Sequence, residues 1–311
     1  MARTERLLRD AGSPDPGIVR CPLCGDDRSV PAFPYETLWN SHHYAYLSCR
    51  NCGTGFVDPL PSEAELLEIY RWATYHSAHY NDTSPPRHQR SMRALSRILH
   101  PGGAVLDFGC GAGDFLRAIR TAGYRCAGVE YEPSTIREAA NRAGVSVRTL
   151  EETLRSGDRF DVIHMSDVLP HLREPAISLR VLERLLRPAG MFLFDGPLEN
   201  NASVVSWTAS SVKKIRRMLR VESPREAPPT MLYRFTAASQ RKFFERMGYR
   251  EMFFEVYETG WPYRATDGTG TKGLAKSVKG AIGWLAVSAA KVLPLGNRYT
   301  AVYRPETNLG G

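Results

Sequence analysis

Short apolar runs alternate with helix-patterned segments over residues 104–195 of this 311-residue chain. Apolar residues at helical spacing predict helices at 114–122, 134–143 and 174–187. The apolar runs between them predict strands at Val105–Phe108, Arg125–Glu130, Val145–Arg148, Asp161–Met165 and Met191–Asp195. Strands separated by helices of this length form βαβ units, because a parallel neighbour needs a crossover connection. We therefore expect an α/β fold with a mostly parallel sheet.

The alternation breaks after Asp195. Residues 198–235, rich in serine, proline and basic residues, predict an insertion. The stretch "TAASQRKFFERMGY" predicts a capped helix that ends at Gly248, and "REMFFEVYE" and "RYTAVYRP" predict two late strands that give the sheet an antiparallel finish. A second insertion, at about 259–295, lies between these strands. Its helical pattern over 272–292 fits a membrane-surface helix or, as we expect, packing on the protein's own sheet.

The first hundred residues are organised differently. Residues 1–20 predict a loose tail, 21–60 a small cysteine-containing domain, and 61–100 a helical connector or lid before a main domain at 101–305. In the connector, Ser62 precedes a helical pattern and Glu65 follows three residues later, which is the signature of a capping box.

The composition is that of an ordinary globular protein, with 42% hydrophobic and 24% charged residues and a net charge of +8. The basic excess permits binding to nucleic acid, anionic lipid or phosphorylated molecules but requires none of them. The run "KKIRRMLR" at Lys213–Arg220 predicts a solvated helix face or a lid. The N-terminal "MARTERLLRD" has no apolar segment like that of a secretory signal, and no stretch of about 18 apolar residues occurs in the sequence. We therefore expect a cytoplasmic protein without a membrane span.

Four of the six cysteines form two pairs, Cys21-x2-Cys24 and Cys49-x2-Cys52. Each CxxC turn directs two thiolates to one point, and two such turns complete a tetrahedral zinc site. The glycine after each second cysteine suits a tight knuckle. Because four thiolates leave no open coordination position, the predicted zinc is structural. Two disulfides or free thiols are the alternative.

A glycine-rich turn follows the first predicted strand, in "VLDFGCGAGDFL" at residues 105–116. Gly109, Gly111 and Gly113 make the pattern GxGxG, whereas a dinucleotide fingerprint would need a glycine at Asp114. The carboxylate of Asp107 would repel a pyrophosphate but attract the ammonium and sulfonium groups of S-adenosylmethionine. The glycines let the backbone approach such a ligand closely.

Glu130 ends the second predicted strand, where a carboxylate can accept hydrogen bonds from both ribose hydroxyls of an adenosine. Together with Asp107 and the glycines, it predicts an S-adenosylmethionine site. The alternative is that the glycines only form a tight turn and that both acids are solvated.

Four separated motifs, "VLDFGCGAGDFL", "GVEYEP", "DVIHMSDVLPHLREP" and "LLRPAGMFLFDGP", resemble those of class I S-adenosylmethionine-dependent methyltransferases. The resemblance covers roughly residues 100–305. It implies a Rossmann-like seven-stranded sheet whose last strand is antiparallel, with the cofactor at the carboxyl ends of the strands.

The resemblance also implies roles for single residues. Asp107 and the three glycines would contact the methionine moiety, and Glu130 the ribose. Residues near the adenine would be Leu150, Glu151, Met165 and Ser166. Tyr131 would either stack on the adenine or pack on its own helix.

Methyl transfer requires an acceptor aligned behind the methyl group and, for a hydroxyl or carbon acid, a base. The segment "SDVLPHL" supplies His171, whose imidazole titrates in the useful range. Relatives commonly carry an acid before this histidine, where this chain has Pro170, so a possible orienting partner is lost. His171 is predicted to act as base or substrate contact, with capping of a helix near Glu174 as the alternative.

Further candidates come from two aromatic segments. In "TYHSAHY", the resemblance makes Tyr80 a lid over the cofactor, with surface side chains as the alternative for the whole segment. The predicted substrate contacts are Tyr75, His76 and His79 from this segment and Tyr233 and Arg234 from "MLYRF".

A four-cysteine ribbon before such a core resembles a subset of the family that modifies sugars and other small metabolites. Large C-methyltransferases of deoxysugars carry a further C-terminal domain, for which this chain is too short. We therefore expect O-methylation of a saccharide or another small polar metabolite.

Two alternatives stay open. The first is an rRNA or tRNA methyltransferase that uses the zinc ribbon for RNA recognition. Against it, the chain lacks an N/D-P-P-Y/F stretch after the fourth strand, and its basic residues show little aromatic interleaving. The second is a non-catalytic module that binds zinc and cofactor and recruits a partner. The sequence makes no prediction of the oligomeric state.

Overall fold

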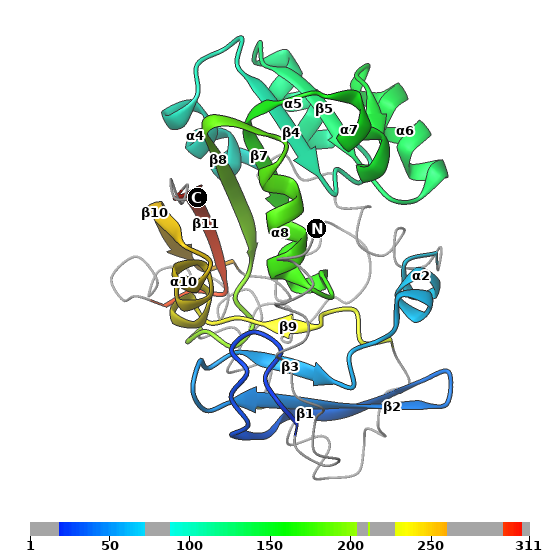
Figure 1. Cartoon of the computed structure of the whole chain (residues 1–311), viewed down its shortest axis with the longest axis vertical. Coiled ribbons are helices and arrows are strands. Elements are labelled where there is room, and N and C mark those ends of the chain that lie inside the picture. Colours follow the sequence, from blue (N-terminus) through cyan, green and yellow to red (C-terminus); the bar gives the residue numbers. More distant parts are fainter. Residues whose placement is uncertain (1–18, 72–87, 204–210, 212–227, 260–294, 307–311) are drawn as a thin grey trace, which may run out of the picture.

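The computed structural model describes residues 19–71, 88–203, 211, 228–259 and 295–306. Its main body is built around a seven-stranded sheet (Figure 1). The strands from β8 to β6 run parallel, and β11 is antiparallel to both of its neighbours, as predicted. In spatial order they are β10 (Tyr249–Tyr257), β11 (Arg298–Pro305), β8 (Leu186–Pro197), β7 (Phe160–Ser166), β4 (Ala104–Phe108), β5 (Arg125–Val129) and β6 (Val147–Arg148).

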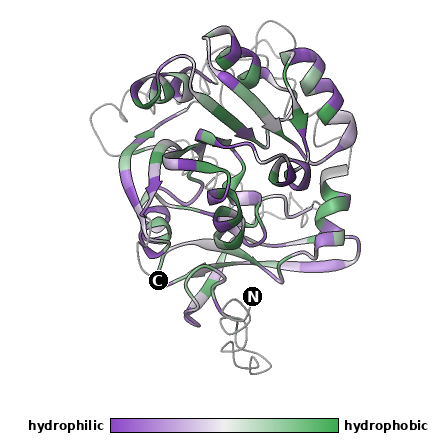
Figure 2. Ribbon diagram, turned by 45° about the horizontal axis from the view of Figure 1, so that its top comes forward, coloured by the Kyte–Doolittle hydropathy of each residue, from purple (hydrophilic) through white to green (hydrophobic). Residues whose placement is uncertain are grey.

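Helices cover both faces of this sheet, because residues of the parallel strands alternate between two apolar surfaces. In β4, for example, Val105 contributes to one apolar cluster and Leu106 to the other. Figure 2 shows green on the inner strands and purple segments on the helices at the rim. One face carries α4 (Gln89–Ile98), α5 (Asp114–Thr121) and α6 (Pro133–Ala143), and the other carries α7 (Leu150–Ser156), α8 (Pro175–Glu183) and α10 (Ala237–Arg246). Within the described residues, no helix is long and apolar enough to cross a bilayer.

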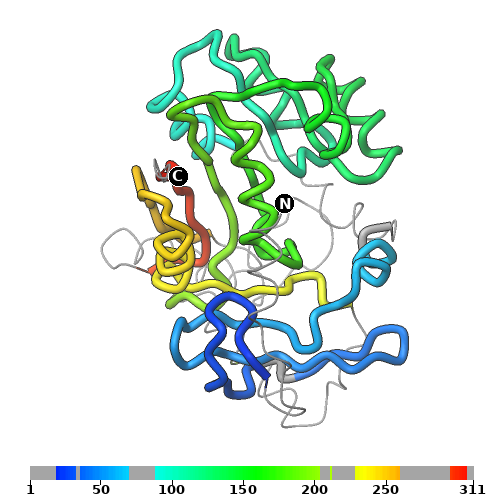
Figure 3. The backbone as a smooth tube through the Cα atoms, viewed as in Figure 1, coloured from blue at the N-terminus to red at the C-terminus, as the bar shows by residue number. Residues whose placement is uncertain are grey.

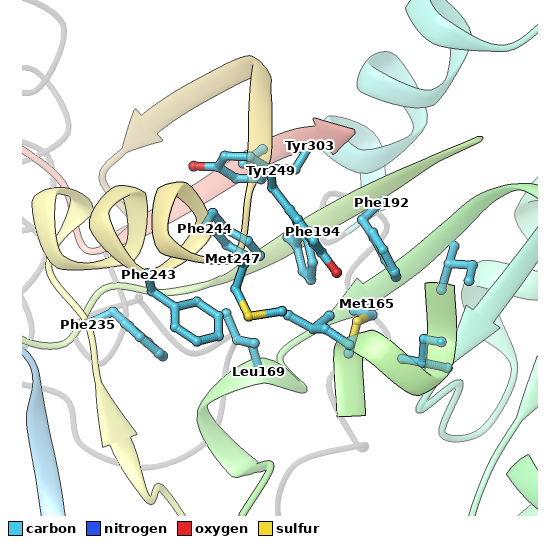
Figure 4. Packing of buried hydrophobic residues seen from close by; sticks show 14 of the residues in the cluster. Met165, Leu169, Phe192, Phe194, Phe235, Phe243, Phe244, Met247, Tyr249 and Tyr303 are labelled. Atoms are coloured by element: carbon cyan, nitrogen blue, oxygen red, sulfur yellow. The ribbon is translucent and has the colours of Figure 1, made fainter. Parts of the chain in front are cut away.

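The apolar cluster beneath α8 and α10 is rich in aromatic rings (Figure 4). The ring of Phe244 lies 4.8 Å from that of Phe194 and 4.1 Å from that of Tyr303, between ring centroids. Aromatic pairs of this kind each add about 0.5–1.5 kcal/mol beyond the area they bury. The cluster extends to Met165 and Leu169, so the core reaches the end of β7.

A second sheet lies next to the cysteine pairs, and Cys49 is the last residue of its strand β2. β1 (Ser29–Trp39), β2 (His42–Cys49) and β3 (Gly55–Asp58) form an antiparallel meander, and β9 (Tyr233–Arg234) pairs with β3. Figure 3 shows the yellow segment that contains β9 running along the blue strands of this second sheet, the ribbon sheet. The ribbon sheet is thus completed by a strand from within the predicted insertion at 198–235.

Local sequence signals place two helix starts. α2 (Glu63–Arg71) begins after Ser62, whose N–H and hydroxyl donate to the carboxylate of Glu65, while the Glu65 N–H donates to the Ser62 hydroxyl. This confirms the predicted capping box. α10 begins with the same reciprocal arrangement between Thr236 and Ser239.

The helix predicted at 174–187 is shorter in the structure. α8 ends at Glu183, and Leu186 already belongs to β8, where it pairs with Phe160 of β7. Pro188 has no N–H with which to continue a helical ladder. Pairing with β7 therefore determines the end of this helix.

Candidate functional site

The carboxyl ends of the parallel strands meet at one edge of the main sheet, and the glycine turn follows β4 there. Gly109, Gly111 and Gly113 have φ angles of 73°, 51° and 83°, in the left-handed region that favours glycine. The Gly109 N–H donates to the carbonyl of Val129 on β5 over 2.8 Å. A Cβ on Gly113 would lie 2.9 Å from the carbonyl oxygen of Ala139. Conformation and packing therefore both require this turn to be glycine-rich.

Asp107 lies on β4 directly before the turn and is buried. Its Oδ1 accepts a hydrogen bond over 2.7 Å from Nδ1 of His164, which is paired with it in register on β7. The His164 side chain is fully buried, with its ring 3.9 Å from that of Phe115. This hydrogen bond satisfies one of the two carboxylate oxygens of Asp107 and ties β7 to β4 next to the glycine turn.

His164 is not among the residues predicted from the sequence. The available signal is a histidine inside the otherwise apolar run "VIHM" of a buried strand. A fully buried polar side chain is uncommon and calls for a partner.

Glu130 follows β5 and faces the glycine turn. Its Oε2 accepts from the Gly111 N–H and its Oε1 from the Tyr131 N–H, each over 2.8 Å. The structure thus brings Glu130 and the glycines together. Tyr131, which follows Glu130 directly, is 57% exposed. Contact of these residues with ribose and adenine stays a prediction.

The remaining predicted adenine contacts border the same edge. Leu150 and Glu151 begin α7; Leu150 packs against the core, while Glu151 is exposed and lies 3.4 Å from the guanidinium of Arg155. Met165 and Ser166 end β7, and the Met165 side chain is buried in the aromatic cluster (Figure 4). Their adenine contacts stay predictions.

His171 ends a short 3-10 helix, η2 (Leu169–His171), that follows β7. Its Nδ1 donates to the carbonyl oxygen of Thr230 over 2.6 Å. Because a carbonyl only accepts, Nδ1 carries a proton in this hydrogen bond. A backbone carbonyl thus supplies the orienting contact that the loss of an acid at Pro170 had put in doubt. α8 begins after Glu174, whose side chain makes no cap hydrogen bond. The alternative role of His171 as a helix cap stays a prediction.

A charged network joins four neighbouring strands of the main sheet, β7, β8, β11 and β10. The Arg298 guanidinium of β11 lies 2.7 Å from the carboxylates of both Asp167 and Asp195. Asp195, buried on β8, also accepts from the hydroxyls of Tyr257 and Thr300, each over 2.8 Å. Burial and the nearby Asp195 carboxylate raise the pKa of Tyr257, so this hydroxyl remains a donor. These residues are not predicted from the sequence, because β11 lies more than a hundred residues beyond β8.

The four predicted zinc ligands converge. All four Sγ atoms lie within 4.8 Å of one another, with 3.7 Å between Cys21 and Cys52 and 3.5 Å between Cys24 and Cys49. A tetrahedral zinc with bonds of about 2.3 Å separates its sulfurs by about 3.8 Å. A disulfide needs about 2.05 Å, so the two-disulfide alternative is wrong. The donor set fits zinc with no further ligand.

The two knuckles have matching backbone geometry. The N–H groups of Gly25 and Gly53 donate to the carbonyls of Cys21 and Cys49, over 2.8 and 3.0 Å. Both glycines have positive φ, 74° and 80°. This confirms that the glycine after each pair suits a tight knuckle.

The predicted substrate contacts divide into two groups. Tyr75, His76, His79 and the predicted lid residue Tyr80 lie outside the described residues. Tyr233 and Arg234 form β9. The Tyr233 ring is buried, whereas the Arg234 guanidinium lies 3.2 Å from Glu199 and 4.2 Å over the ring of Tyr46. Both side chains thus pack between the ribbon and the main body, and their contact with substrate stays a prediction.

Comparison with known proteins agrees with this arrangement. A family model described as a methyltransferase domain matches residues 80–251, more than half of the chain. A ubiquinone biosynthesis O-methyltransferase of Methylocella silvestris is 27% identical over 203 residues, 60% of this chain and 73% of that protein. Another, of a Methylobacterium species, is 28% identical over 131 residues, which are 40% of this chain. That match spans about half of the relative's length, 52%.

Solved structures similar to this chain include two methyltransferases. One, from Geobacter sulfurreducens in complex with S-adenosyl-L-homocysteine, has 18% identity and a TM-score of 0.43, covering 77% of this chain and 98% of that one. The other, an S-adenosylmethionine-dependent methyltransferase from Mesorhizobium loti, has 14% identity and a TM-score of 0.46, covering 71% and 98%.

The segment matched by the family model contains the glycine turn, Asp107, Glu130 and His171. The chain therefore belongs to the methyltransferase domain family.

Proposed function

We propose that this methyltransferase methylates a hydroxyl oxygen of a small polar metabolite such as a saccharide, with His171 as the base. The observation that carries the proposal is the 2.6 Å hydrogen bond from His171 Nδ1 to the Thr230 carbonyl. It makes Nε2 the proton-accepting nitrogen. η2 follows β7, the neighbour of β4, so His171 lies at the same edge of the sheet as the glycine turn.

When bound, S-adenosylmethionine supplies a methyl group activated by its positively charged sulfonium. Nε2 of His171 accepts the proton of the acceptor hydroxyl while the oxygen–methyl bond forms. The methyl–sulfur bond breaks at the same time, and its electron pair stays on sulfur. Positioning of the acceptor behind the methyl group is the main task left to the protein.

Each proposed cofactor residue contacts a different part of S-adenosylmethionine. Asp107 offers negative charge to the ammonium group of the methionine moiety. The glycine turn allows close backbone approach at Gly109, Gly111 and Gly113. Each Glu130 oxygen, although it already accepts one backbone hydrogen bond, has a further lone pair for a ribose hydroxyl.

The four-cysteine cluster would hold one zinc ion through Cys21, Cys24, Cys49 and Cys52. A complete thiolate shell gives no open position for a substrate, so its contribution is structural. Oxygen as the acceptor atom is supported by the curated relatives, which are named as O-methyltransferases.

The test is transfer of labelled methyl from S-adenosylmethionine into a cell extract that is separated into small molecules, glycans, protein and RNA. We expect label in small molecules or glycans. His171→Gln should lower the rate by about 10²–10⁴-fold, as for loss of a general base. His100→Gln, at an exposed histidine after α4, is the matched control and should leave the rate unchanged.

Two results would contradict the proposal. Label only in RNA would indicate an RNA methyltransferase. A protein that binds the cofactor but labels no fraction would indicate a non-catalytic module.

A further inference from the structure

The segment Thr230–Arg234 lies between the loop 170–173, which contains His171, and the four-cysteine ribbon, which comprises the cysteine pairs and strands β1 to β3. Hydrogen bonds of its main-chain groups hold it on both sides. On the side of loop 170–173, the Thr230 carbonyl accepts from His171 Nδ1 and the Leu232 N–H donates to the Pro170 carbonyl over 2.9 Å. On the ribbon side, the Leu232 carbonyl accepts from the Val57 N–H over 3.1 Å. Leu232 therefore connects β3 of the ribbon directly with the residue before His171.

Strand pairing continues this connection. Tyr233 and Arg234 form β9 and are in register with Phe56 and Gly55 of β3. A Cβ on Gly55 would lie 3.1 Å from Cβ of Arg234, so the two strands approach closely there. Because β9 is paired with β3, a shift of β3 would also shift β9 and the Thr230 carbonyl.

Two side chains make a second connection. The hydroxyl of the buried Tyr233 donates to the carbonyl of Arg173, two residues beyond His171, over 2.8 Å. The Arg173 Nε donates to the carbonyl of Pro61, just beyond β3, over 3.0 Å. The loop 170–173 is thus held at both of its ends by groups attached to the ribbon.

The apolar cluster beneath α8 and α10 contains both predicted zinc ligands and residues next to His171. Cys21, Cys49 and Cys52 are buried in it, together with Phe56, Leu232, Tyr233 and Leu169. Protein interiors are close-packed, so displacement at the cysteines is transmitted to their neighbours. The ribbon is not an independent module attached by a linker.

We infer that the four-cysteine ribbon, when it holds its metal, positions His171 through β9 and the Thr230 carbonyl. The ribbon supplies no atom to the reaction. It determines where the carbonyl that orients the imidazole lies, and therefore the direction of Nε2. This inference rests on the proposed role of His171, but the following experiment observes the imidazole and its surroundings without any acceptor.

The experiment records two-dimensional NMR spectra of the full chain with isotope-labelled histidine rings, before and after zinc is removed with a chelator. The chain has eight histidines, so the His171 signal is assigned by its loss in His171→Gln. We expect the His171 signal to shift or broaden on zinc removal, while that of His164, in the cofactor half of the sheet, stays in place. Hydrogen exchange at the Val57 and Leu232 amides should become at least about tenfold faster.

A second variant keeps the inference testable if zinc removal unfolds the protein. Tyr233→Phe retains the ring and all four cysteines but removes the hydrogen bond to Arg173. We expect it to perturb the His171 signal, to speed exchange at Leu232 by about fivefold, and to leave zinc content and cofactor affinity unchanged. Tyr303→Phe is the matched control, because its hydroxyl bonds to Glu251 on β10, away from the ribbon.

Unchanged His171 signals and unchanged exchange at Leu232, after zinc removal and in Tyr233→Phe, would overturn the inference. So would a purified protein that contains no zinc and takes none up. The proposed function fails by a different result, namely methyl transfer that is unaffected by His171→Gln. The two failures are therefore distinguishable.

Discussion

Nδ1 of His164 lies 2.7 Å from Oδ1 of Asp107, and the two side chains are 0% and 4% exposed. The bond joins β7 to β4 at the position where the glycine turn begins. An ionised carboxylate away from water is stable only with a partner. His164 therefore accounts for how the proposed cofactor carboxylate is tolerated inside the protein.

Replacing Asp107 by asparagine should weaken cofactor binding. The substitution keeps the side-chain shape but removes the charge proposed to attract the ammonium group. We expect the dissociation constant for S-adenosylmethionine to rise at least about tenfold, which corresponds to about 1.4 kcal/mol. Isothermal titration calorimetry measures it. Asp114→Asn is the control, since Asp114 is part-exposed on α5 and pairs with Arg142. Equal affinities in both variants would remove Asp107 from the proposed cofactor site.

Gly113→Ala should destabilise the protein more than Gly157→Ala. Both glycines have positive φ, 83° and 76°, so both substitutions carry the backbone strain of about 1–2 kcal/mol. Among the described residues, a Cβ at Gly113 meets the backbone of Ala139, whereas a Cβ at Gly157 has no heavy atom within 4 Å. We expect a further loss of about 1–3 kcal/mol in the free energy of unfolding for Gly113→Ala. Urea denaturation of the two variants checks this, and equal losses would contradict the proposed close approach to Ala139.

Removal of one cysteine ligand should weaken zinc binding. In Cys24→Ser we expect less than stoichiometric zinc by metal analysis and a lower melting temperature, because metal binding is coupled to folding. Cys126→Ser is the control. Cys126 lies outside the cluster, where its Sγ contacts the Leu116 carbonyl. Full zinc content in Cys24→Ser would contradict a four-thiolate site.

The carboxylate of Glu65, which belongs to the capping box of α2, should make the free energy of unfolding depend on pH. Hydrogen bonds from the hydroxyl and N–H of Ser62, and then from Tyr44, lower the pKa of Glu65 to about 2. Because the folded-state pKa lies below the unfolded value of about 4.3, this contribution is complete above about pH 5 and is lost as the pH falls toward 2. Glu65→Gln should therefore cost about 1–3 kcal/mol at pH 7 and little at pH 2.

Denaturation curves of Glu65→Gln at several pH values test this prediction. Glu63→Gln, at an exposed position in the same helical turn, is the control and should show no such trend. A Glu65→Gln deficit that stays constant from pH 7 to pH 2 would contradict the role of the charged carboxylate.

Several features of this protein follow from local sequence. The alternation of strands and helices predicts the parallel sheet, since crossover connections need that spacing. Ser62 and Glu65 predict the start of α2, and the glycines at 109, 111 and 113 predict a turn with positive φ. The cysteine spacing predicts that four thiols converge. The capping box, the glycine turn and each CxxC pair depend on residues close together in the chain, so the pattern itself contains the physical constraint. The meeting of the two cysteine pairs, which lie 25 to 31 residues apart, depends on packing.

Other features depend on tertiary structure. His164 gains its role only because β7 pairs with β4, and Arg298 reaches Asp167 and Asp195 only because β11 inserts beside β8. The carbonyl that orients His171 belongs to Thr230, 59 residues further along the chain. No local pattern encodes such contacts, because they arise from packing between distant segments. The sequence by itself determined the fold class and the candidate cofactor and metal ligands, and tertiary packing decided which groups hold Asp107 and His171 in place.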